Sequence, residues 1–220
     1  MNQSIRAFIF DLDGVITDTA EFHYLSWSQL AAEEGIPFTR EDNEQLRGVS
    51  RRESLNRVLK GKPIDEATAQ AWMTRKNDYY LRYLDQIQPN HVLPGVNAFL
   101  RAAQSAGIAM GIGSASKNAK TVLERLQIAS FFEVIGDGYS VTNGKPAPDL
   151  FVWVAGGLHI PPVEAVVFED SEAGIDAALK GGFWTVGLGH SSIQHAHMVS
   201  EDGLSTLTVE AVLKRFAQSS

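Results

Sequence analysis

Cysteine is absent from the 220 residues of the chain. Disulfide bonds, thiolate nucleophiles and cysteine-ligated zinc sites are therefore excluded. Long apolar runs are absent too, since none approaches the roughly 20 residues that a membrane-spanning helix needs. The N-terminus enters a strand pattern directly, without the charged, apolar and cleavable sections of a signal peptide. We therefore expect a cytoplasmic protein without a membrane partner.

Positive charge is scarce, because 19 Lys and Arg residues stand against 26 Asp and Glu residues, for a formal net charge of -7. Nucleic acids and anionic membranes both attract a basic surface, so neither is an expected partner. A small anionic substrate needs only a local cluster of cations, and it is not excluded. Apolar residues at 44% and charged residues at 20% are typical of a globular protein with a substantial core.

The most informative stretch follows the first apolar run. Residues 5–10 include β-branched and aromatic side chains, and they predict a buried strand. Side chains alternate along a strand, so Asp11 and Asp13 leave on one side while Leu12 returns to the core. Two carboxylates in one small space require a cation, a raised pKa on one of them, or both. One acid as nucleophile and the other as general acid/base is a natural division of roles.

Residues 17–88 show helical patterns only. The predicted helices cover residues 20–34, 41–46, 51–60 and 66–87. Thr19 has the place of an N-cap for the first helix, and Ser50 with Glu53 has capping-box spacing for the third. Lys76 falls inside the apolar stripe of the fourth helix, where a cation either extends to solvent or faces a cleft.

From Pro94 onward, helices and strands alternate. Strands are predicted at residues 108–112, 133–135, 165–168 and 185–188, and helices at residues 95–106, 117–126, 149–158, 172–180 and 209–216. This alternation implies a parallel sheet that helices cover on both faces. The first strand precedes the helical segment, so that segment is an insertion. We expect an α/β core of residues 1–16 and 89–220 with an inserted all-helical cap domain of residues 17–88.

Polar side chains stand where strands of this core end. They are Asp11, Asp13, Ser114, Ser116, Lys145, Glu169 and Asp170. Because the carboxyl ends of parallel strands meet at one edge of a sheet, we expect these side chains to gather there. Carboxylates without imidazole or thiolate favour Mg²⁺ as the cation. Carboxylates, Mg²⁺, a lysine and a helix N-terminus are the working parts of phosphoryl transfer.

At these residues the sequence resembles the haloacid dehalogenase-like (HAD) hydrolases. The four motifs of that family occur in order as Asp11-Leu12-Asp13-Gly14-Val15, Ser114, Lys145-Pro146 and Glu169-Asp170-Ser171. Within the family the chain is most similar to the β-phosphoglucomutase group, in stretches that the wider family does not share: residues 14–20, 46–51, 75–78 and 114–118. Arg47 is a departure, since relatives are expected to carry Lys there. The resemblance implies a Rossmann-like core with an inserted helical cap.

The resemblance also implies catalytic roles. Asp11 would be the nucleophile that becomes an aspartyl phosphate, and Asp13 the general acid/base. Ser114 and Lys145 would hold the transferring phosphoryl group. The Mg²⁺ ligands would be Asp11, the backbone carbonyl of Asp13, Glu169 and Asp170.

The substrate implied by the resemblance is a small phosphorylated sugar. The implied contacts are Thr19, His23, Trp27, Gly48, Val49, Ser50, Arg51, Lys76, Ala115, Ser116, Lys117 and Asn118. Of these, Arg51, Ser116, Lys117 and Asn118 would hold a distal phosphate, and His23, Trp27 and Lys76 would face the sugar. Thr19 would help set the hinge and the position of Asp13. The implied reaction interconverts β-glucose 1-phosphate and glucose 6-phosphate through a bisphosphate, beneath a cap that excludes water. We expect a monomer that binds neither nucleic acid nor membrane.

Two other functions stay open, namely a small-molecule phosphatase of the same family and a non-catalytic sugar-phosphate sensor. The four motifs do not separate the phosphatase from the mutase. Individual residues also have structural interpretations: Glu169 and Asp170 form a helix-capping turn, Arg51 is simply exposed, and His23 and Trp27 are packing residues.

Three histidines, His190, His195 and His197, invite a metal-binding interpretation, which we reject. They lie in a loop rich in Ser and Gly without a nearby carboxylate ligand pattern, and we expect them to be exposed. Residues 111–113 do not form a dinucleotide fingerprint, because the third glycine is missing.

Overall fold

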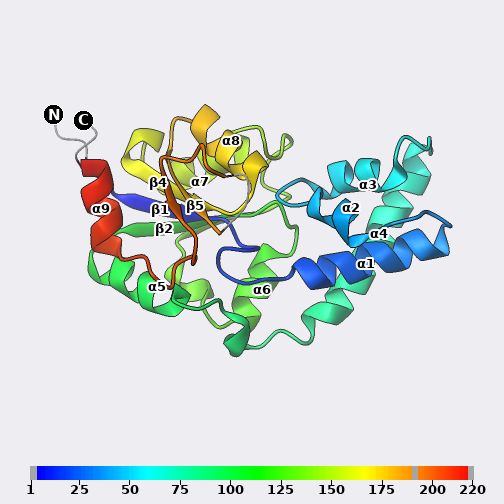
Figure 1. Ribbon diagram of the computed structural model, residues 1–220, viewed down its shortest axis with the longest axis horizontal. Helices are drawn as coiled ribbons and strands as arrows, with labels where there is room; N and C mark the ends of the chain where they lie inside the picture. The colour runs from blue at the N-terminus through cyan, green and yellow to red at the C-terminus, as the bar shows by residue number, and fades with distance from the viewer. Residues whose placement is uncertain (1–3, 190–192, 218–220) are drawn as a thin grey trace.

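The computed structural model describes residues 4–189 and 193–217. Its strands form one parallel six-stranded sheet in the order β3-β2-β1-β4-β5-β6 (Figure 1). They are β1 (Ala7–Phe10), β2 (Ala109–Gly113), β3 (Val134–Gly136), β4 (Ala165–Glu169), β5 (Trp184–Leu188) and β6 (Met198–Ser200). The predicted α/β fold with a parallel sheet is confirmed.

Nine α-helices occur in the described ranges. They are α1 (Ala20–Glu33), α2 (Arg40–Glu44), α3 (Arg51–Leu59), α4 (Glu66–Leu84), α5 (Val96–Ser105), α6 (Ala119–Arg125), α7 (Asp149–Gly157), α8 (Glu172–Lys180) and α9 (Val209–Ala217). Short 3₁₀ turns lie at η1 (Pro89–His91), η2 (Ala129–Phe131) and η3 (Pro162–Glu164). Within the described parts of the chain, no helix combines the length and the apolar content that a membrane crossing needs.

Helices cover both faces of the sheet (Figure 1). Phe8 and Phe10 of β1 pack on one face with α5, α6 and α9, and Ile9 packs on the other face with α7 and α8. Every residue of β1 is buried, because the strand lies at the centre of the sheet and has a helix layer on each side. This explains why the strand is a continuous apolar run rather than an alternating one.

The helical segment α1–α4 has a hydrophobic core of its own, to which Trp27, Leu55 and Met73 contribute. Figure 1 shows it beside the sheet, joined to it by the chain before α1 and the chain after α4. The adjacent residues Tyr79 and Tyr80 of α4 belong to different cores, Tyr79 to that of the helical segment and Tyr80 to that of the sheet. The insertion of an all-helical segment after the first strand is confirmed. The domain boundaries at residues 16/17 and 88/89 stay predictions.

Several local predictions need correction. Helix α4 ends at Leu84 rather than at residue 87, and α6 begins at Ala119 rather than at residue 117. The capping box at α3 is half formed, because Ser50 accepts from the Glu53 amide while the Glu53 carboxylate pairs with Arg57. Strand β6 was not predicted, since three residues are too few for a periodic pattern.

Candidate active site

The carboxyl ends of β1, β2 and β4 meet at one edge of the sheet, as predicted. Strand β1 lies between β2 and β4, and the backbone N–H of Asp11 donates to the carbonyl of Phe168 at 2.9 Å. Ser114 follows β2, and Glu169 ends β4. Strand order therefore brings together side chains that lie more than 150 residues apart in the chain.

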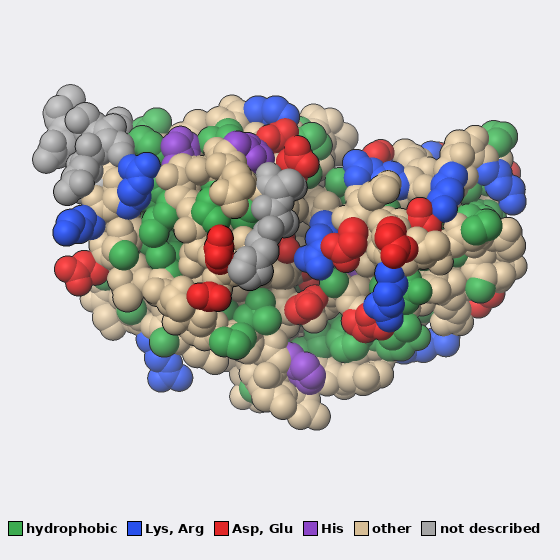
Figure 2. Space-filling model, viewed as in Figure 1, with side chains coloured by type: hydrophobic (Ala, Val, Ile, Leu, Met, Phe, Trp, Pro, Cys, Tyr) green, Lys and Arg blue, Asp and Glu red, His purple; other side chains and the backbone are tan. Residues whose placement is uncertain are grey.

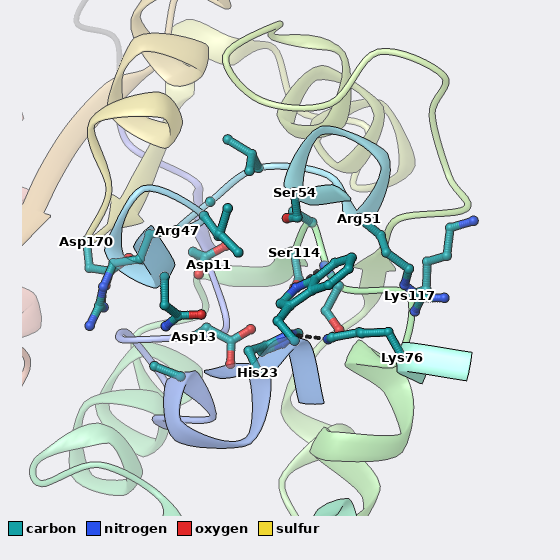
Figure 3. A pocket seen from close by; sticks show the side chains of 18 residues that line it. Asp11, Asp13, His23, Arg47, Arg51, Ser54, Lys76, Ser114, Lys117 and Asp170 are labelled. Atoms are coloured by element: carbon teal, nitrogen blue, oxygen red, sulfur yellow. Dashed lines mark hydrogen bonds and ion pairs between the residues drawn. The ribbon is translucent and has the colours of Figure 1, made fainter. Parts of the chain in front are cut away.

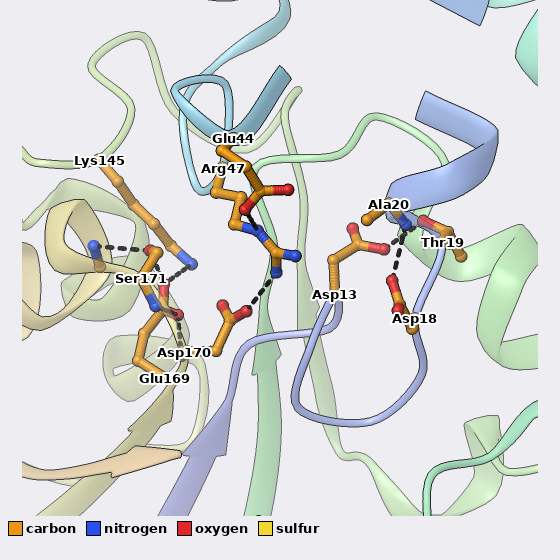
Figure 4. Close-up of polar contacts among 11 residues, drawn as sticks. Asp13, Asp18, Thr19, Ala20, Glu44, Arg47, Lys145, Glu169, Asp170 and Ser171 are labelled. Atoms are coloured by element: carbon orange, nitrogen blue, oxygen red, sulfur yellow. Dashed lines mark hydrogen bonds and ion pairs between the residues drawn. The ribbon is translucent and has the colours of Figure 1, made fainter. Parts of the chain in front are cut away.

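Asp11, Glu169 and Asp170 form a close group of acids, in which one oxygen of each lies within 4.8 Å of the others. Lys145 is buried beside them, and its Nζ donates to Asp11 Oδ1 at 2.5 Å and to Glu169 Oε1 at 2.8 Å (Figure 4 shows the contact with Glu169). Burial alone would lower the pKa of Lys145, but Asp11 and Glu169 together raise it above its usual value. The lysine is therefore a fixed cation within this acidic group.

Glu169 is fully buried, and hydrogen bonds hold both of its oxygens. Oε1 accepts from Lys145 and from Ser171 Oγ at 3.0 Å, and Oε2 accepts from the backbone N–H groups of Asp170 and Ser171 at 2.7 and 3.2 Å. Ser171 also caps α8, as predicted, since its Oγ accepts from the amide of Gly174. These contacts fix the end of β4 and the start of α8 relative to each other, next to Asp11 and Asp170.

The acidic group retains an excess of negative charge that calls for a cation. Burial first, and the neighbouring Glu169 next, raise the pKa of Asp170 to about 8. Burial raises the pKa of Asp11 well above its usual value although Lys145 opposes the rise. A closely spaced set of oxygen ligands fits Mg²⁺, and a bound divalent cation would favour the ionised form of both acids.

Asp13 lies at the start of the loop after β1 and is partly buried. The hydroxyl of Thr19 donates to Asp13 Oδ1 (Figure 4) and lies 3.0 Å from the hydroxyl of Tyr80. Burial raises the pKa of Asp13, and the hydrogen bond from Thr19 works against that rise. Thr19 occupies the N-cap position of α1 but makes no side-chain cap bond, and its hydroxyl donates to Asp13 instead.

A cleft lies between this edge of the sheet and the helical segment (Figure 3). Of the predicted site residues, those that line it are Asp11, Asp13, His23, Trp27, Gly48, Val49, Arg51, Lys76, Ser114, Ala115, Ser116, Lys117 and Asp170. The predicted residues outside its lining are Thr19, Ser50, Asn118, Lys145 and Glu169. Thr19 contacts the lining residue Asp13, and Lys145 contacts the lining residue Asp11 as well as Glu169. Ser50 and Asn118 occupy the N-cap positions of α3 and α6. Ser50 lines a neighbouring pocket that shares Arg51 and Lys117 with the cleft.

The cleft also includes residues that the sequence did not single out as site residues, namely Ala20, Asn43, Leu46, Arg47 and Ser54. Arg47 is the most informative of them. Its Nη1 donates to Asp170 Oδ2 at 3.0 Å and its Nε to Glu44 at 2.7 Å, so it links the helical segment to the acidic group (Figure 4). Arg47 lies in residues 46–51, a stretch of resemblance in which relatives are expected to carry Lys. This difference is the sequence signal that could have identified it.

Lys76 is the innermost cation of the helical segment and is 2% exposed. Its Nζ lies 2.9 Å from His23 Nδ1 (Figure 3). It also lies 5.2 and 4.7 Å from the ring centroids of Trp27 and Tyr80. Burial first, and Arg51 next, hold the pKa of Lys76 well below its usual value. Burial and Lys76 likewise lower the pKa of His23, so His23 is the neutral acceptor of this contact near neutral pH.

Arg51 and Lys117 lie near Lys76 in the cleft lining. Arg51 Nη2 donates to Asn77 Oδ1 at 2.8 Å, and Asn118 Nδ2 donates to the same oxygen at 2.9 Å. Lys117 Nζ lies 4.4 Å from the ring centroid of Tyr139. Asn77 belongs to one of the stretches of resemblance, residues 75–78, but is not among the predicted site residues. Within the described residues, Arg51, Lys76 and Lys117 make no ion pair with a carboxylate.

The predicted exposure of the C-terminal histidines is confirmed for His195 and His197, and His190 lies outside the described residues. A single carboxylate lies beside His195, where Asp176 Oδ1 is 3.1 Å from Nε2. His197 contacts Thr185 instead. Across the part of the chain that the structure covers, the one group of three or more close metal-binding side chains is that of Asp11, Glu169 and Asp170.

Surface charge shows no single dominant patch in the visible face, where acidic and basic side chains alternate over the helical segment (Figure 2). The cations that matter for the site are those inside the cleft. Figure 3 shows Arg51, Lys76 and Lys117 on the side of the cleft away from Asp170.

Comparison with known proteins agrees with this geometry. The sequence model of a family described as haloacid dehalogenase-like hydrolase matches residues 5–182. The chain is similar to the β-phosphoglucomutase of Bacillus subtilis, at 38% identity over 97% of this chain and 96% of that protein. It is similar in structure to the β-phosphoglucomutase of Clostridium difficile, with a TM-score of 0.93, 39% identity and coverage of 96% and 97% of the two chains.

A more distant relative has a different name. The phosphorylated carbohydrates phosphatase of Thermotoga maritima is 27% identical over 95% of this chain and 97% of that protein. Mutases and phosphatases therefore both occur among the relatives of this enzyme. The family model matches most of the chain, and the Bacillus subtilis relative is 38% identical over nearly its whole length. The protein therefore belongs to the haloacid dehalogenase-like hydrolases.

Proposed function

We propose that this enzyme is a Mg²⁺-dependent β-phosphoglucomutase. It would interconvert β-glucose 1-phosphate and glucose 6-phosphate through an aspartyl phosphate and glucose 1,6-bisphosphate. The observation that carries this proposal is that one cleft has two different ends. Figure 3 shows Asp11, Asp13 and Asp170 on one side of the cleft, and the cations Arg51 and Lys117, which have no carboxylate partner among the described residues, on the other.

A second anion site favours a mutase over a phosphatase. A phosphatase has to hold one phosphate, whereas a mutase has to hold a bisphosphate with its second phosphate away from the nucleophile. Arg51 and Lys117 have no carboxylate partner among the described residues, so they are available to an anionic ligand. With Ser116 and Asn118, they would hold this distal phosphate.

The sheet edge would supply the chemistry. Asp11 attacks phosphorus, so that a bond from its carboxylate oxygen to phosphorus forms while the bond from phosphorus to the sugar oxygen breaks. Asp13 gives a proton to that leaving oxygen and takes one from the attacking hydroxyl in the reverse step. Ser114 and Lys145 hold the transferring group by hydrogen bonding and charge.

The residues that would hold Mg²⁺ are Asp11, the backbone carbonyl of Asp13, Glu169 and Asp170. When bound, the ion would supply positive charge that stabilises the transferring phosphoryl group. Lys145 would add a second positive charge, since its ammonium group is already fixed between Asp11 and Glu169.

The helical segment would act as a cap that keeps water away from the aspartyl phosphate. His23, Trp27 and Lys76 would face the sugar, while Gly48 and Val49 close the cleft from the loop before α3. Gly48 has φ +71°, and a Cβ built there would lie 2.3 Å from Ser171 Oγ, so this loop approaches the sheet edge too closely for a side chain.

The experiment supplies β-glucose 1-phosphate, Mg²⁺ and a trace of glucose 1,6-bisphosphate, and follows glucose 6-phosphate and free phosphate separately. We expect glucose 6-phosphate to form at least tenfold faster than free phosphate. Release of phosphate without isomerisation would contradict the proposal. That outcome would support the second candidate, a sugar-phosphate phosphatase, which the similarity to the Thermotoga maritima phosphatase favours.

A further inference from the structure

We propose that Tyr80 is a positioning residue for phosphoryl transfer, whose hydroxyl fixes the hydroxyl of Thr19 and thereby orients the carboxyl group of Asp13. This inference rests on the proposed role of Asp13 as general acid/base. Tyr80 does not line the cleft, so it acts through its neighbours rather than on the substrate.

The direction of the hydrogen bonds follows from counting protons. Thr19 has one hydroxyl proton, and it donates that proton to Asp13 Oδ1. When Asp13 acts as the base it is ionised and only accepts, so Thr19 then meets the Tyr80 hydroxyl, 3.0 Å away, as an acceptor. In that state Tyr80 donates. The order is Tyr80 to Thr19 to Asp13.

The phenol of Tyr80 is kept in its donating form. Burial first, and the charge of Asp13 next, raise the pKa of Tyr80, while hydrogen bonds with Thr19 and Ser116 partly oppose the rise.

Packing leaves the Tyr80 ring one position. The residue is 1% exposed, its ring centroid lies 4.2 Å from that of His23, and Lys76 Nζ lies 4.7 Å from its centroid. Its side chain belongs to the core of the sheet region although α4 belongs to the helical segment. Rotation of the ring would require these neighbours to move, so the hydroxyl is held toward Thr19.

The consequence is a connection between three parts of the molecule. Asp13 follows β1, Thr19 lies at the junction before α1, and Tyr80 comes from α4. Without the Tyr80 donor, the Thr19 hydroxyl is free to turn toward other acceptors, and Asp13 loses its fixed orientation. The predicted loss falls on the transfer step, because substrate contacts stay in place.

The test compares Tyr80→Phe with a matched control in the same helix. Tyr79→Phe also removes one phenol hydroxyl, but Tyr79 bonds to Glu33 at 2.7 and 2.9 Å in the core of the helical segment. We expect Tyr80→Phe to lower kcat at least tenfold with less than a twofold change in KM and a Tm close to that of Tyr79→Phe. A kcat within twofold of the wild type would overturn the inference.

A double-variant cycle tests whether Tyr80 acts through Thr19. Thr19→Val alone should lower kcat, and adding Tyr80→Phe to it should lower kcat by less than a further twofold. Effects that multiply would show that Tyr80 acts by another route and would overturn the relay. Crystal structures of wild type and Tyr80→Phe add a readout independent of activity: an Asp13 side chain that keeps its orientation and its bond to Thr19 also overturns it.

The cycle also separates this inference from the proposed function. If the wild type releases phosphate without isomerising its substrate, the mutase proposal fails. The same variants then test Tyr80 on the rate of phosphate release, because the leaving oxygen needs a proton in either reaction.

Discussion

The two sides of the cleft contain buried lysines in opposite situations. Lys145, on the sheet side, contacts two carboxylates, and its pKa is raised. Lys76, on the helical side, contacts a histidine and two aromatic rings, and its pKa is held well below the usual value. Lys145 is therefore paired before any ligand arrives. Lys76 has no carboxylate partner among the described residues, so a ligand would have to supply one.

This difference suggests that the sheet side carries out the chemistry and the helical side recognises the ligand. Groups that are paired and hydrogen-bonded in advance, such as Glu169, are held in one geometry, which suits bond making and breaking. Groups that lack an anion, such as Lys76, gain most when an anion binds. The following predictions test whether chemistry and recognition separate along this line.

Asp11→Asn should have the largest effect. The amide keeps the shape of the side chain but cannot form the acyl phosphate, so we expect kcat to fall on the order of 10⁴-fold or more. Incubation with glucose 1,6-bisphosphate followed by mass spectrometry should detect a phosphorylated wild type and no phosphorylated variant. Activity within tenfold of the wild type would remove Asp11 from the role of nucleophile.

Asp13→Ala should keep the fold and lose about 10²- to 10⁴-fold in kcat, since general acid/base catalysis contributes that much. Circular dichroism and the melting temperature should match the wild type within a few degrees. Near-normal turnover of this variant would refute the assignment of Asp13.

The two lysines should respond differently to the same substitution. Lys145→Met leaves Asp11 and Glu169 buried without their cation, and we expect it to cost about 3–5 kcal/mol in the free energy of unfolding. Lys76→Met removes a buried cation that has no carboxylate partner in the described structure, so it should be neutral or stabilising while KM rises. Denaturant unfolding without Mg²⁺ measures both, and equal destabilisation by the two variants would contradict the comparison.

The smallest effect concerns pH. His23 has a lowered pKa in the folded protein, so below about pH 6.5 the unfolded chain binds a proton that the folded protein does not. Its contribution therefore makes stability fall as pH drops below that value, by at most about 1.4 kcal/mol per pH unit. Because the raised pKa values of Asp11 and Asp170 act in the opposite sense, we compare wild type with His23→Gln between pH 5 and 7. A difference between the two proteins that is independent of pH would contradict the prediction.

Much of the sheet edge was predictable because side-chain alternation and the order of helices and strands can be read from short stretches of sequence. Alternation along residues 5–13 put Asp11 and Asp13 on one side, and the alternation of helices with strands implied a parallel sheet. Parallel strands bring their carboxyl ends together, so the clustering of Asp11 with Lys145 and Glu169 followed. The local pattern was misleading at Thr19, which makes no side-chain cap bond, whereas the family resemblance did imply its role beside Asp13.

The sequence by itself determined the strands, the order of the motifs and the edge at which they meet, because chain direction and side-chain period suffice for these. The tertiary structure decided which groups of the helical segment reach that edge. Tyr80 meets Thr19, Asn77 meets Asn118 and Arg47 meets Asp170 only because of how α4 and the loop before α3 lie against the sheet. Helical periodicity specifies which face of a helix is buried, but it does not specify which distant side chain that face will meet.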